Sequence, residues 1–379
     1  MSGAVLDGLD LGYDIPALPG MAEAEIETPC LILDLDALEA NIARMQAMAD
    51  AMGVRLRCHG KMHKSADVAR LQIAAGAVGV CCQKVAEAEA FVRAGIGDVL
   101  VTNEVRGPVK TDRLARLARQ ARIGVCIDDP AAVSELSVAA MAHGVTIDAL
   151  VEIDCGAGRC GVARGAPAAA IASAIAAAPG LRFAGLQAYQ GAAQHVADPV
   201  ARGALIEAAL GAVRETLDAL KVAGLPCPTV TGAGTGSFAM EGGSGLYTEL
   251  QCGSYAFMDA DYARVAPVAG EPFAHALFVL TGVMSRPAPG RAVCDAGLKV
   301  LSMDSGLPVV AGCEGVSYAR CSDEHGVLDD PEGRLAVGDR LRLIPGHCDP
   351  TCNLHDWYVA LRGGRVEALW PVTARGRCL

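Results

Sequence analysis

The chain alternates eight times between a short apolar run and a longer stretch rich in Ala, Leu, Glu and Arg. Short apolar runs predict buried strands and the longer stretches predict helices, so the pattern indicates βαβ units repeated at intervals of about 20 to 45 residues. Eight parallel strands with covering helices close a (β/α)8 barrel, whereas an open doubly wound sheet would have the same alternation. The runs lie at 54–58, 78–82, 99–102, 123–127, 149–153, 183–188, 228–231 and 248–251.

A change of pattern near Phe273 predicts a second domain. Helical stretches end there, and strand-like runs follow at 277–283, 292–295, 308–311, 340–344, 357–361 and 365–370. The length of 379 residues suits one large domain and a smaller one. We expect an N-terminal extension over 1–25, a barrel over 26–270 and a mostly β domain that carries a metal site over 271–379. The run at 31–33 would be a ninth strand, and it and the extension could join the β domain.

Composition limits the partners and the compartment. The net charge of −11 argues against nucleic acid and acidic membranes as partners. The 15 cysteines are an odd number without disulfide-like spacing, and residues 1–20 contain no Lys or Arg of the kind that begins a signal peptide. The Ala-rich stretch 166–178 is too short to span a bilayer. We expect a soluble protein of the reducing cytoplasm.

Polar residues and glycines follow most of the predicted barrel strands. In a (β/α)8 barrel the active site lies at the carboxyl ends of the strands, so these residues would meet at one face. Their shared placement favours the barrel over the open sheet. They are His59-Gly60-Lys61, Gln83-Lys84, Thr102-Asn103-Glu104, 154–159, Tyr189-Gln190, 231–237 and 251–255.

Lys61 is the candidate nucleophile. A lysine amine becomes nucleophilic when burial or nearby positive charge lowers its pKa, and His59, His63 and Lys64 could supply that charge. We therefore predict that Lys61 forms a Schiff base, with a solvated basic loop as the alternative. Lys64 and Lys84 are weaker candidates because each lies at the start of a predicted helix.

The glycine-rich loop at 232–237 follows the seventh barrel strand. Glycines let backbone N–H groups turn toward a phosphate, and Thr235 and Ser237 add hydroxyl donors. Barrels often hold phosphate after strands seven and eight, which adds Gly253 and Ser254. A plain flexible turn is the alternative. A reactive lysine combined with a phosphate site indicates pyridoxal phosphate as the cofactor.

His347 and Asp349 form the candidate metal site. Residues two apart in an extended chain face the same side, so these two side chains would point together and Cys348 away. One imidazole and one carboxylate suit Mg²⁺ or Mn²⁺, with water and substrate as further ligands. Zinc held by Cys348, Cys352 and a histidine is the second interpretation, and a polar loop without metal is the third.

These motifs together resemble a known family over nearly the whole chain. It is the fold-type III, pyridoxal-phosphate-dependent D-threonine aldolase and D-serine dehydratase group, which is related to alanine racemases. The likeness is strongest to its members that cleave 3-hydroxy-D-aspartate. The motifs are His59-Gly60-Lys61-Met62-His63-Lys64, Gly158-Arg159-Cys160-Gly161, Gly234-Thr235-Gly236-Ser237, 253–259, Ser322-Asp323-Glu324-His325-Gly326 and 345–350.

The resemblance implies a barrel with a β domain, working as a homodimer on a small β-hydroxy amino acid. It implies Lys61 as the Schiff-base lysine and His63 as the residue that moves the substrate hydroxyl proton. It implies that the other site residues divide as follows: Gln83, Arg159 and Tyr189 beside the cofactor ring, Thr235, Gly236, Gly253 and Ser254 at its phosphate, and His347 and Asp349 at a divalent metal.

The resemblance also orders the candidate reactions. We expect metal-dependent retro-aldol cleavage of 3-hydroxy-D-aspartate to glycine and glyoxylate. A D-threonine aldolase, or a D-serine or 3-hydroxyaspartate dehydratase, is the alternative. The D-serine dehydratase branch has a cysteine where this chain has Asp349, which favours cleavage over dehydration.

Overall fold

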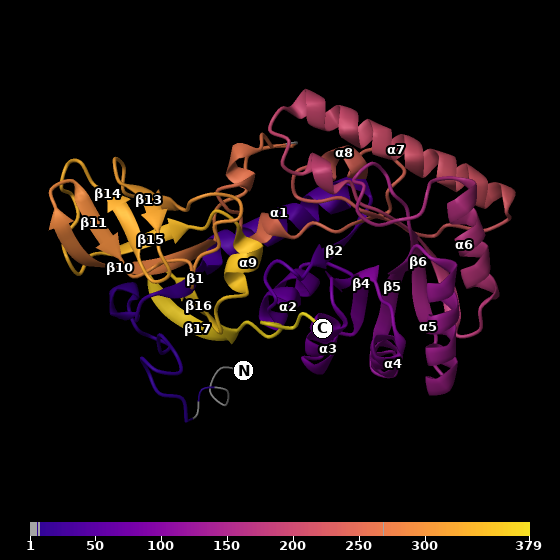
Figure 1. Ribbon diagram of the computed structural model, residues 1–379, viewed down its shortest axis with the longest axis horizontal. Helices are drawn as coiled ribbons and strands as arrows, with labels where there is room; N and C mark the ends of the chain where they lie inside the picture. Colours follow the sequence, from indigo (N-terminus) through magenta and orange to yellow (C-terminus); the bar gives the residue numbers. More distant parts are fainter. Residues whose placement is uncertain (1–5, 7, 268) are drawn as a thin grey trace.

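The structure is a computed structural model that describes residues 6, 8–267 and 269–379. Figure 1 shows two parts side by side, one in which helices cover a set of strands and one made mostly of strands. The strands of the first part form a closed ring. Helix α1 (Leu35–Met52) connects the two parts, because it follows a strand of the second part and precedes the first strand of the ring.

The ring is a closed barrel of eight parallel strands, which confirms the predicted (β/α)8 fold and rules out the open sheet. Helices α1 to α8 alternate with strands β2 to β9 along the chain. The strands are β2 (Arg55–His59), β3 (Gly79–Cys82), β4 (Asp98–Glu104), β5 (Arg122–Ile127), β6 (Ile147–Glu152), β7 (Leu181–Ala188), β8 (Val230–Gly232) and β9 (Glu249–Leu250). The remaining helices are α2 (Ala66–Ala74), α3 (Val85–Arg93), α4 (Pro108–Leu117), α5 (Pro130–His143), α6 (Ala166–Ala177), α7 (Pro199–Val222) and α8 (Phe238–Gly242).

The Ala-rich stretch forms α6, which packs on β6 and β7 through the buried side chains of Ala168, Ala169, Ile171, Ala172 and Ile175. Across the described residues, no helix combines the length and the apolar character that crossing a bilayer requires.

The second part is a nine-stranded sheet that confirms the predicted mostly β domain. Its strands run in the order β13-β14-β11-β10-β1-β16-β17, and β15 pairs with both β10 and β12. They are β1 (Cys30–Asp34), β10 (Leu277–Ala288), β11 (Arg291–Cys294), β12 (Val309–Ala311), β13 (Ser317–Cys321), β14 (Gly326–Asp329), β15 (Arg340–Ile344), β16 (Trp357–Arg362) and β17 (Arg365–Pro371).

The N-terminal strand belongs to this sheet and not to the barrel. Strand β1 pairs antiparallel with β10 and parallel with β16, so the barrel range 26–270 includes one strand of the second domain. The described part of the extension also packs there, since Gly20 N–H donates to Val366 O and Ala22 bridges Arg365. All four residues Cys30–Leu33 are buried, which a central strand covered on both faces requires.

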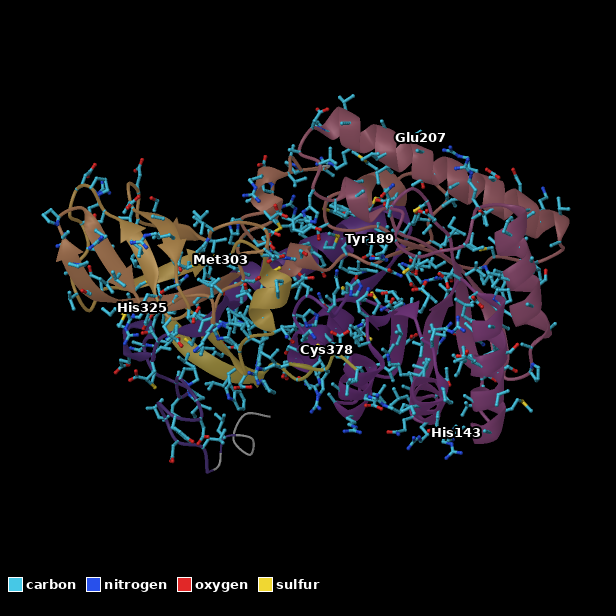
Figure 2. The ribbon with its side chains drawn as sticks, viewed as in Figure 1. His143, Tyr189, Glu207, Met303, His325 and Cys378 are labelled. Atoms are coloured by element: carbon cyan, nitrogen blue, oxygen red, sulfur yellow. The ribbon has the colours of Figure 1, made fainter. Side chains whose placement is uncertain are left out.

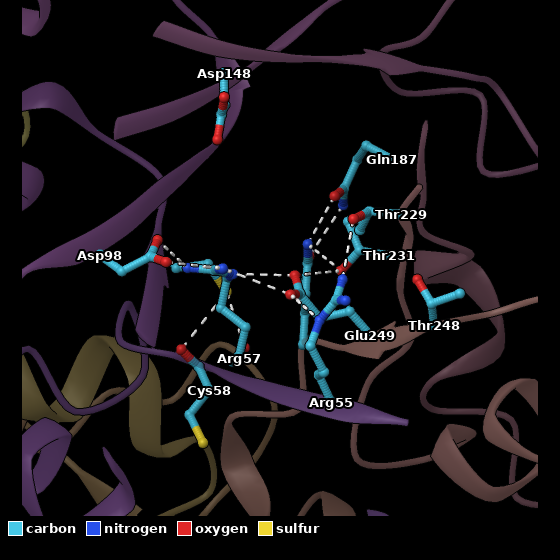
Figure 3. Close-up of polar contacts among 12 residues, drawn as sticks. Arg55, Arg57, Cys58, Asp98, Asp148, Gln187, Thr229, Thr231, Thr248 and Glu249 are labelled. Atoms are coloured by element: carbon cyan, nitrogen blue, oxygen red, sulfur yellow. Dashed lines mark hydrogen bonds and ion pairs between the residues drawn. The ribbon is translucent and has the colours of Figure 1, made fainter. Parts of the chain in front are cut away.

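Charged side chains line the amino-terminal mouth of the barrel (Figure 3). Arg57 on β2 is buried and bridges two carboxylates, with Nε 3.0 Å from Glu249 Oε1 and Nη1 2.6 Å from Asp98 Oδ1. Burial opposes the charge of Arg57, but the two carboxylates outweigh it and raise the pKa of the guanidinium. Since β2 and β9 are the first and last strands of the barrel, the pair Arg57–Glu249 lies across the closing seam.

We expect Arg57→Met to lower the free energy of unfolding by about 3–5 kcal/mol, because Glu249 and Asp98 lose the buried cation between them and keep only the more exposed Arg55 and Arg122 as partners. Arg55→Met is the matched control. Arg55 pairs with the same Glu249 at 3.3 Å, but its side chain is 45% exposed, so its loss should cost about 1 kcal/mol or less. Urea unfolding followed by circular dichroism measures both, and equal effects would contradict a special role for Arg57.

Candidate active site

A cavity of about 140 Å³ lies at the carboxyl ends of the barrel strands, where the second domain reaches the barrel. Figure 2 shows Tyr189, one of its lining residues, near the middle of the molecule, whereas His143 and Glu207 lie at its edge. Nine of the predicted site residues line the cavity: Lys61, Gln83, Arg159, Tyr189, Thr235, Gly253, Ser254, His347 and Asp349. His63 and Gly236 do not.

Lys61 follows β2 and is the lysine that reaches the cavity. Its Nζ lies 3.6 Å from Asp349 Oδ2. The expected neighbours do not lower its pKa, because the Asp349 carboxylate raises it against the opposing effect of burial. Lys64 is turned away and pairs with Glu87 at 2.9 Å, and Lys84 is exposed at the start of α3. The structure therefore favours Lys61 over both rivals.

His59 and Gln83 form one wall of the cavity. His59 Nε2 lies 3.0 Å from Gln83 Nε2 and 3.2 Å from Thr102 Oγ1, and Gln83 Nε2 donates to the same hydroxyl. Burial, helped by the charge of Lys61, holds the pKa of His59 well below its usual value. This wall is therefore rigid and uncharged near neutral pH.

Arg159 and Tyr189 lie next to each other on another wall. The Arg159 guanidinium carbon is 5.6 Å from the centre of the Tyr189 ring, and its Nη2 lies 3.4 Å from Glu152 Oε1. Burial raises the pKa of Tyr189, so its hydroxyl stays protonated at neutral pH. These contacts hold the guanidinium in the cavity wall.

The glycine-rich loop and the start of the segment after β9 form a cradle for an anion. Backbone N–H groups of Thr235 and Gly253 donate to no acceptor within the described residues. A Cβ at Gly253 would lie 3.0 Å from His59 O, so a larger residue there would crowd this carbonyl and glycine allows the close approach. Free N–H groups beside a lining hydroxyl, that of Ser254, are the donors that a phosphate needs.

Gly236 has a different place in this loop. Its N–H donates to Gln194 Oε1 at 3.1 Å, and a Cβ there would lie 2.3 Å from Gln194 O. The structure thus gives Gly236 a packing role against the segment that follows β7, and its N–H is already used. The sequence motif alone could not reveal Gln194 as the competing acceptor.

His347 and Asp349 face one another as predicted, but the chain there is not extended. His347 is the residue before α9 (Cys348–Cys352), and Asp349 lies in the first turn of that helix. The helix starts here because the buried Asp259 carboxylate accepts the Cys348 N–H at 2.9 Å. His347 Nε2 is 3.7 Å from Asp349 Oδ1, and its Nδ1 is 2.7 Å from Asp304 Oδ2.

This donor set fits a cation that keeps water or substrate as ligands. Asp304 fixes the tautomer of His347 and leaves Nε2 free on the side of Asp349. Among the residues that the structure describes, no group of three or more His, Cys, Asp or Glu side chains is arranged to hold a metal ion. Cys348 and Cys352 are fully buried, and burial raises the pKa of both thiols. A closed zinc site is therefore unsupported.

His63 lies in the core beneath the cavity. It is fully buried between Phe91 and Phe257, and its Nδ1 accepts the Ser65 N–H at 3.0 Å. Burial lowers its pKa to about 4. The structure does not bring His63 to the surface of the cavity.

His195 is a cavity residue that the sequence reasoning missed. It lines the cavity with its side chain 49% exposed, and its Nδ1 lies 2.6 Å from Asp261 Oδ2. This contact leaves Nε2 as the free ring nitrogen, the arrangement of a histidine base oriented by a carboxylate. The signal was present in the sequence, since His195 lies in the loop after a barrel strand, but Asp261 is distant in the chain.

Comparisons with known proteins agree with this fold. The model of the alanine racemase N-terminal domain matches residues 33–261, and that of a putative serine dehydratase domain matches residues 276–361. The chain is 59% identical to 3-hydroxy-D-aspartate aldolase of Paracoccus denitrificans (strain Pd 1222), covering 98% of this chain and 97% of that one.

Two solved structures are also similar. D-threonine aldolase from Filomicrobium marinum is 52% identical with a TM-score of 0.94, over 96% of this chain and 100% of that one. D-threo-3-hydroxyaspartate dehydratase from Delftia sp. HT23 is 31% identical with a TM-score of 0.82, over 92% and 98%. The chain therefore belongs to the alanine racemase-like, fold-type III family of pyridoxal-phosphate enzymes, in the group that contains the 3-hydroxy-D-aspartate and D-threonine aldolases.

Proposed function

We propose that this enzyme cleaves 3-hydroxy-D-aspartate to glycine and glyoxylate, using pyridoxal phosphate and a divalent cation such as Mg²⁺ or Mn²⁺. The observation that carries the proposal is the meeting of a lysine and a His/Asp pair in one cavity, where Asp349 lies 3.6 Å from Lys61 and 3.7 Å from His347. The name of the relative that is 59% identical supports the choice of substrate.

The cavity residues fit both groups. Lys61 would hold the cofactor covalently, with Gln83, Arg159 and Tyr189 beside its ring and Thr235, Gly253 and Ser254 at its phosphate. Gly236, whose N–H donates to Gln194, would support this loop by packing. His347 and Asp349 would hold the cation. When bound, the cofactor accepts the electron pair left on Cα and the cation lowers the pKa of a hydroxyl.

His195 is the histidine best placed to take the β-hydroxyl proton. Asp261 holds its Nδ1, which keeps Nε2 available as a base and stabilises the ring once it is protonated. The proposal that His63 moves this proton stays a prediction, but its burial beneath the cavity favours His195.

The charge of the cavity suits a substrate with two carboxylates. Among the lining residues Asp349 is the one carboxylate, against the two cations Lys61 and Arg159. This balance favours 3-hydroxyaspartate over threonine, which has a methyl group in place of the second carboxylate. D-threonine cleavage is the second candidate, supported by the solved structure that is 52% identical.

Dehydration is the alternative within the family, represented by the dehydratase relative that is 31% identical. The carboxylate of Asp349 argues against it, since the D-serine dehydratase branch is expected to have a cysteine at this position. We also propose that the enzyme is a cytoplasmic homodimer. The cytoplasm is supported by its 15 cysteines, all unpaired.

We expect the enzyme to release glyoxylate and glycine from 3-hydroxy-D-aspartate, and to lose at least about 90% of this activity in EDTA until Mn²⁺ or Mg²⁺ is restored. Glyoxylate is measured by its hydrazone and glycine by chromatography. Lys61→Ala is the inactive control, because the cofactor would lose its covalent attachment.

Other products would point to the alternatives. Oxaloacetate with ammonia would contradict the aldolase proposal and favour dehydration. A higher kcat/KM with D-threonine than with 3-hydroxy-D-aspartate would make the enzyme a D-threonine aldolase. Full activity in EDTA would exclude the His347/Asp349 metal site.

We expect His195→Asn to lower kcat by about 10²–10⁴-fold, because the reaction loses its base. His63→Asn is the matched control, since an Asn oxygen can replace Nδ1 as the acceptor for Ser65 N–H. It should keep kcat within about tenfold. Steady-state kinetics at saturating cation separate the two, and the reverse order of effects would make His63 the base.

We expect Asp304→Asn to weaken Mn²⁺ binding by about 10–100-fold, because the carboxylate that orients His347 loses its charge. Titration calorimetry with Mn²⁺ measures this loss directly. Asp323→Asn, in an exposed turn of the second domain, is the control and should bind Mn²⁺ like the wild type. Equal affinities in all three proteins would contradict the role of Asp304.

A further inference from the structure

Two carboxyl groups lie together at the carboxyl ends of β4 and β6. Glu152 is the last residue of β6 and is buried, with 4% of its surface exposed. Glu104 is the last residue of β4, and a register shift between Val101 and Glu104 precedes it. Such bulges change the direction of a side chain near an active site. Here Glu104 comes within hydrogen-bonding reach of Glu152.

The two carboxyls each leave a buried oxygen without a donor. Within the described residues, neither Glu104 Oε1 nor Glu152 Oε2 has a hydrogen-bond partner. Two ionised carboxylates cannot bond to each other, because both only accept, and an unsatisfied buried acceptor is costly. One proton between the two groups would satisfy both oxygens at once.

The charge of the surroundings supports a single negative charge on the pair. Arg159 Nη2 lies 3.4 Å from Glu152 Oε1 on the side of the cavity. One shared proton leaves a charge of −1 against the +1 of Arg159, whereas two ionised carboxylates would leave an excess negative charge in a buried place. The thiols of Cys126 on β5 and Cys160 also face the pair, and they add only weak donors.

We propose that Glu104 and Glu152 share one proton and form a singly charged pair that positions Arg159 in the cavity wall. Its consequence for catalysis rests on the proposed function, in which Arg159 lies beside the cofactor ring. The existence of the singly charged pair does not depend on the proposed function. These are positioning residues, because they reach the cavity through Arg159.

The shared proton makes the stability of the folded protein depend on pH. Burial, followed by the neighbouring Glu104, raises the pKa of Glu152 to about 8. The unfolded chain releases this proton once the pH exceeds the ordinary glutamate pKa of 4.5, whereas the folded protein keeps it up to a pH of about 8. The free energy of unfolding therefore falls as the pH rises from 4.5 toward about 8. Because the two sites interact, this pKa belongs to the pair.

The first test needs no cofactor. Infrared spectroscopy of the protein at pH 7 should show a protonated-carboxyl band that is lost in Glu104→Gln and in Glu152→Gln. In each variant the remaining carboxylate no longer faces a second charge and can accept a hydrogen bond from the new amide, and together with the nearby Arg159 this opposes the effect of burial. In both variants the fall of the unfolding temperature between pH 5 and 8 should also be smaller than in the wild type.

Glu241→Gln is the matched control. Glu241 is also buried, and burial raises its pKa to about 7, but it lies on α8 beside Ser237. Glu241→Gln should remove only the contribution of Glu241 to the protonated-carboxyl absorbance and leave the band of the Glu104–Glu152 pair unchanged. If both variants of the pair keep the full wild-type band, beyond the part that Glu241→Gln removes, the shared proton is overturned.

The second test asks whether the single charge positions Arg159. Each single Gln variant keeps one negative charge, so we expect it to bind pyridoxal phosphate within about threefold of the wild type, measured by fluorescence titration of the cofactor-free protein. Glu104→Gln/Glu152→Gln together remove that charge and should weaken binding by about tenfold or more and shift the absorbance maximum of the bound cofactor.

The outcomes separate this proposal from the proposed function. A double variant that matches the wild type, or a single variant as defective as the double, would overturn the positioning role. A wild-type protein that binds no pyridoxal phosphate would instead refute the proposed function, while the infrared result on the pair would stand by itself.

Discussion

The closure of the barrel between β2 and β9 is the constraint on which the site depends. Arg57 crosses that seam to Glu249 at the amino-terminal mouth, and His59 N–H donates to Cys252 O toward the other end. Lys61 follows β2 and Gly253 follows β9, so the pairing of these two strands places the lysine next to the phosphate cradle. A buried ion pair is a costly way to hold two strands, but it penalises any register that separates the arginine from its carboxylates.

The second domain completes the site because segments from both the N-terminal and the C-terminal parts of the chain form its sheet. Strand β1 lies between β10 and β16, and α1 then carries the chain into the barrel. Strand β15 returns toward the barrel, where Ala260 N–H donates to Pro345 O and Asp261 N–H to Gly346 O. These two bonds place His347 at the cavity. They also place Asp261, which holds His195, so the metal pair and the histidine base share one backbone support.

The features that follow from periodicity were predictable, and those that follow from packing were not. Alternating apolar runs predicted all eight barrel strands, including β9, which is only two residues long. Strands β13 and β14 were missed because SYARC and GVLD lack a clear apolar pattern. The catalytic role of His63, which the family resemblance implies, stays a prediction, and the sequence could not show that the turn after β2 buries His63 between two phenylalanines. The phosphate role of Gly236 stays a prediction, and the motif could not reveal that the Gly236 N–H donates to Gln194.

Asp349 connects the two halves of the proposed chemistry. In the structure its carboxylate raises the pKa of Lys61, which keeps the amine protonated and therefore unreactive. The same carboxylate also faces His347 and is a ligand of the proposed cation site. A carboxylate shared with a divalent cation attracts an ammonium group less strongly, so filling that site would lower the pKa of Lys61. A single side chain would thus make the reactivity of the lysine depend on the cation, and a cysteine in its place would be too weak an anion at this burial to do so.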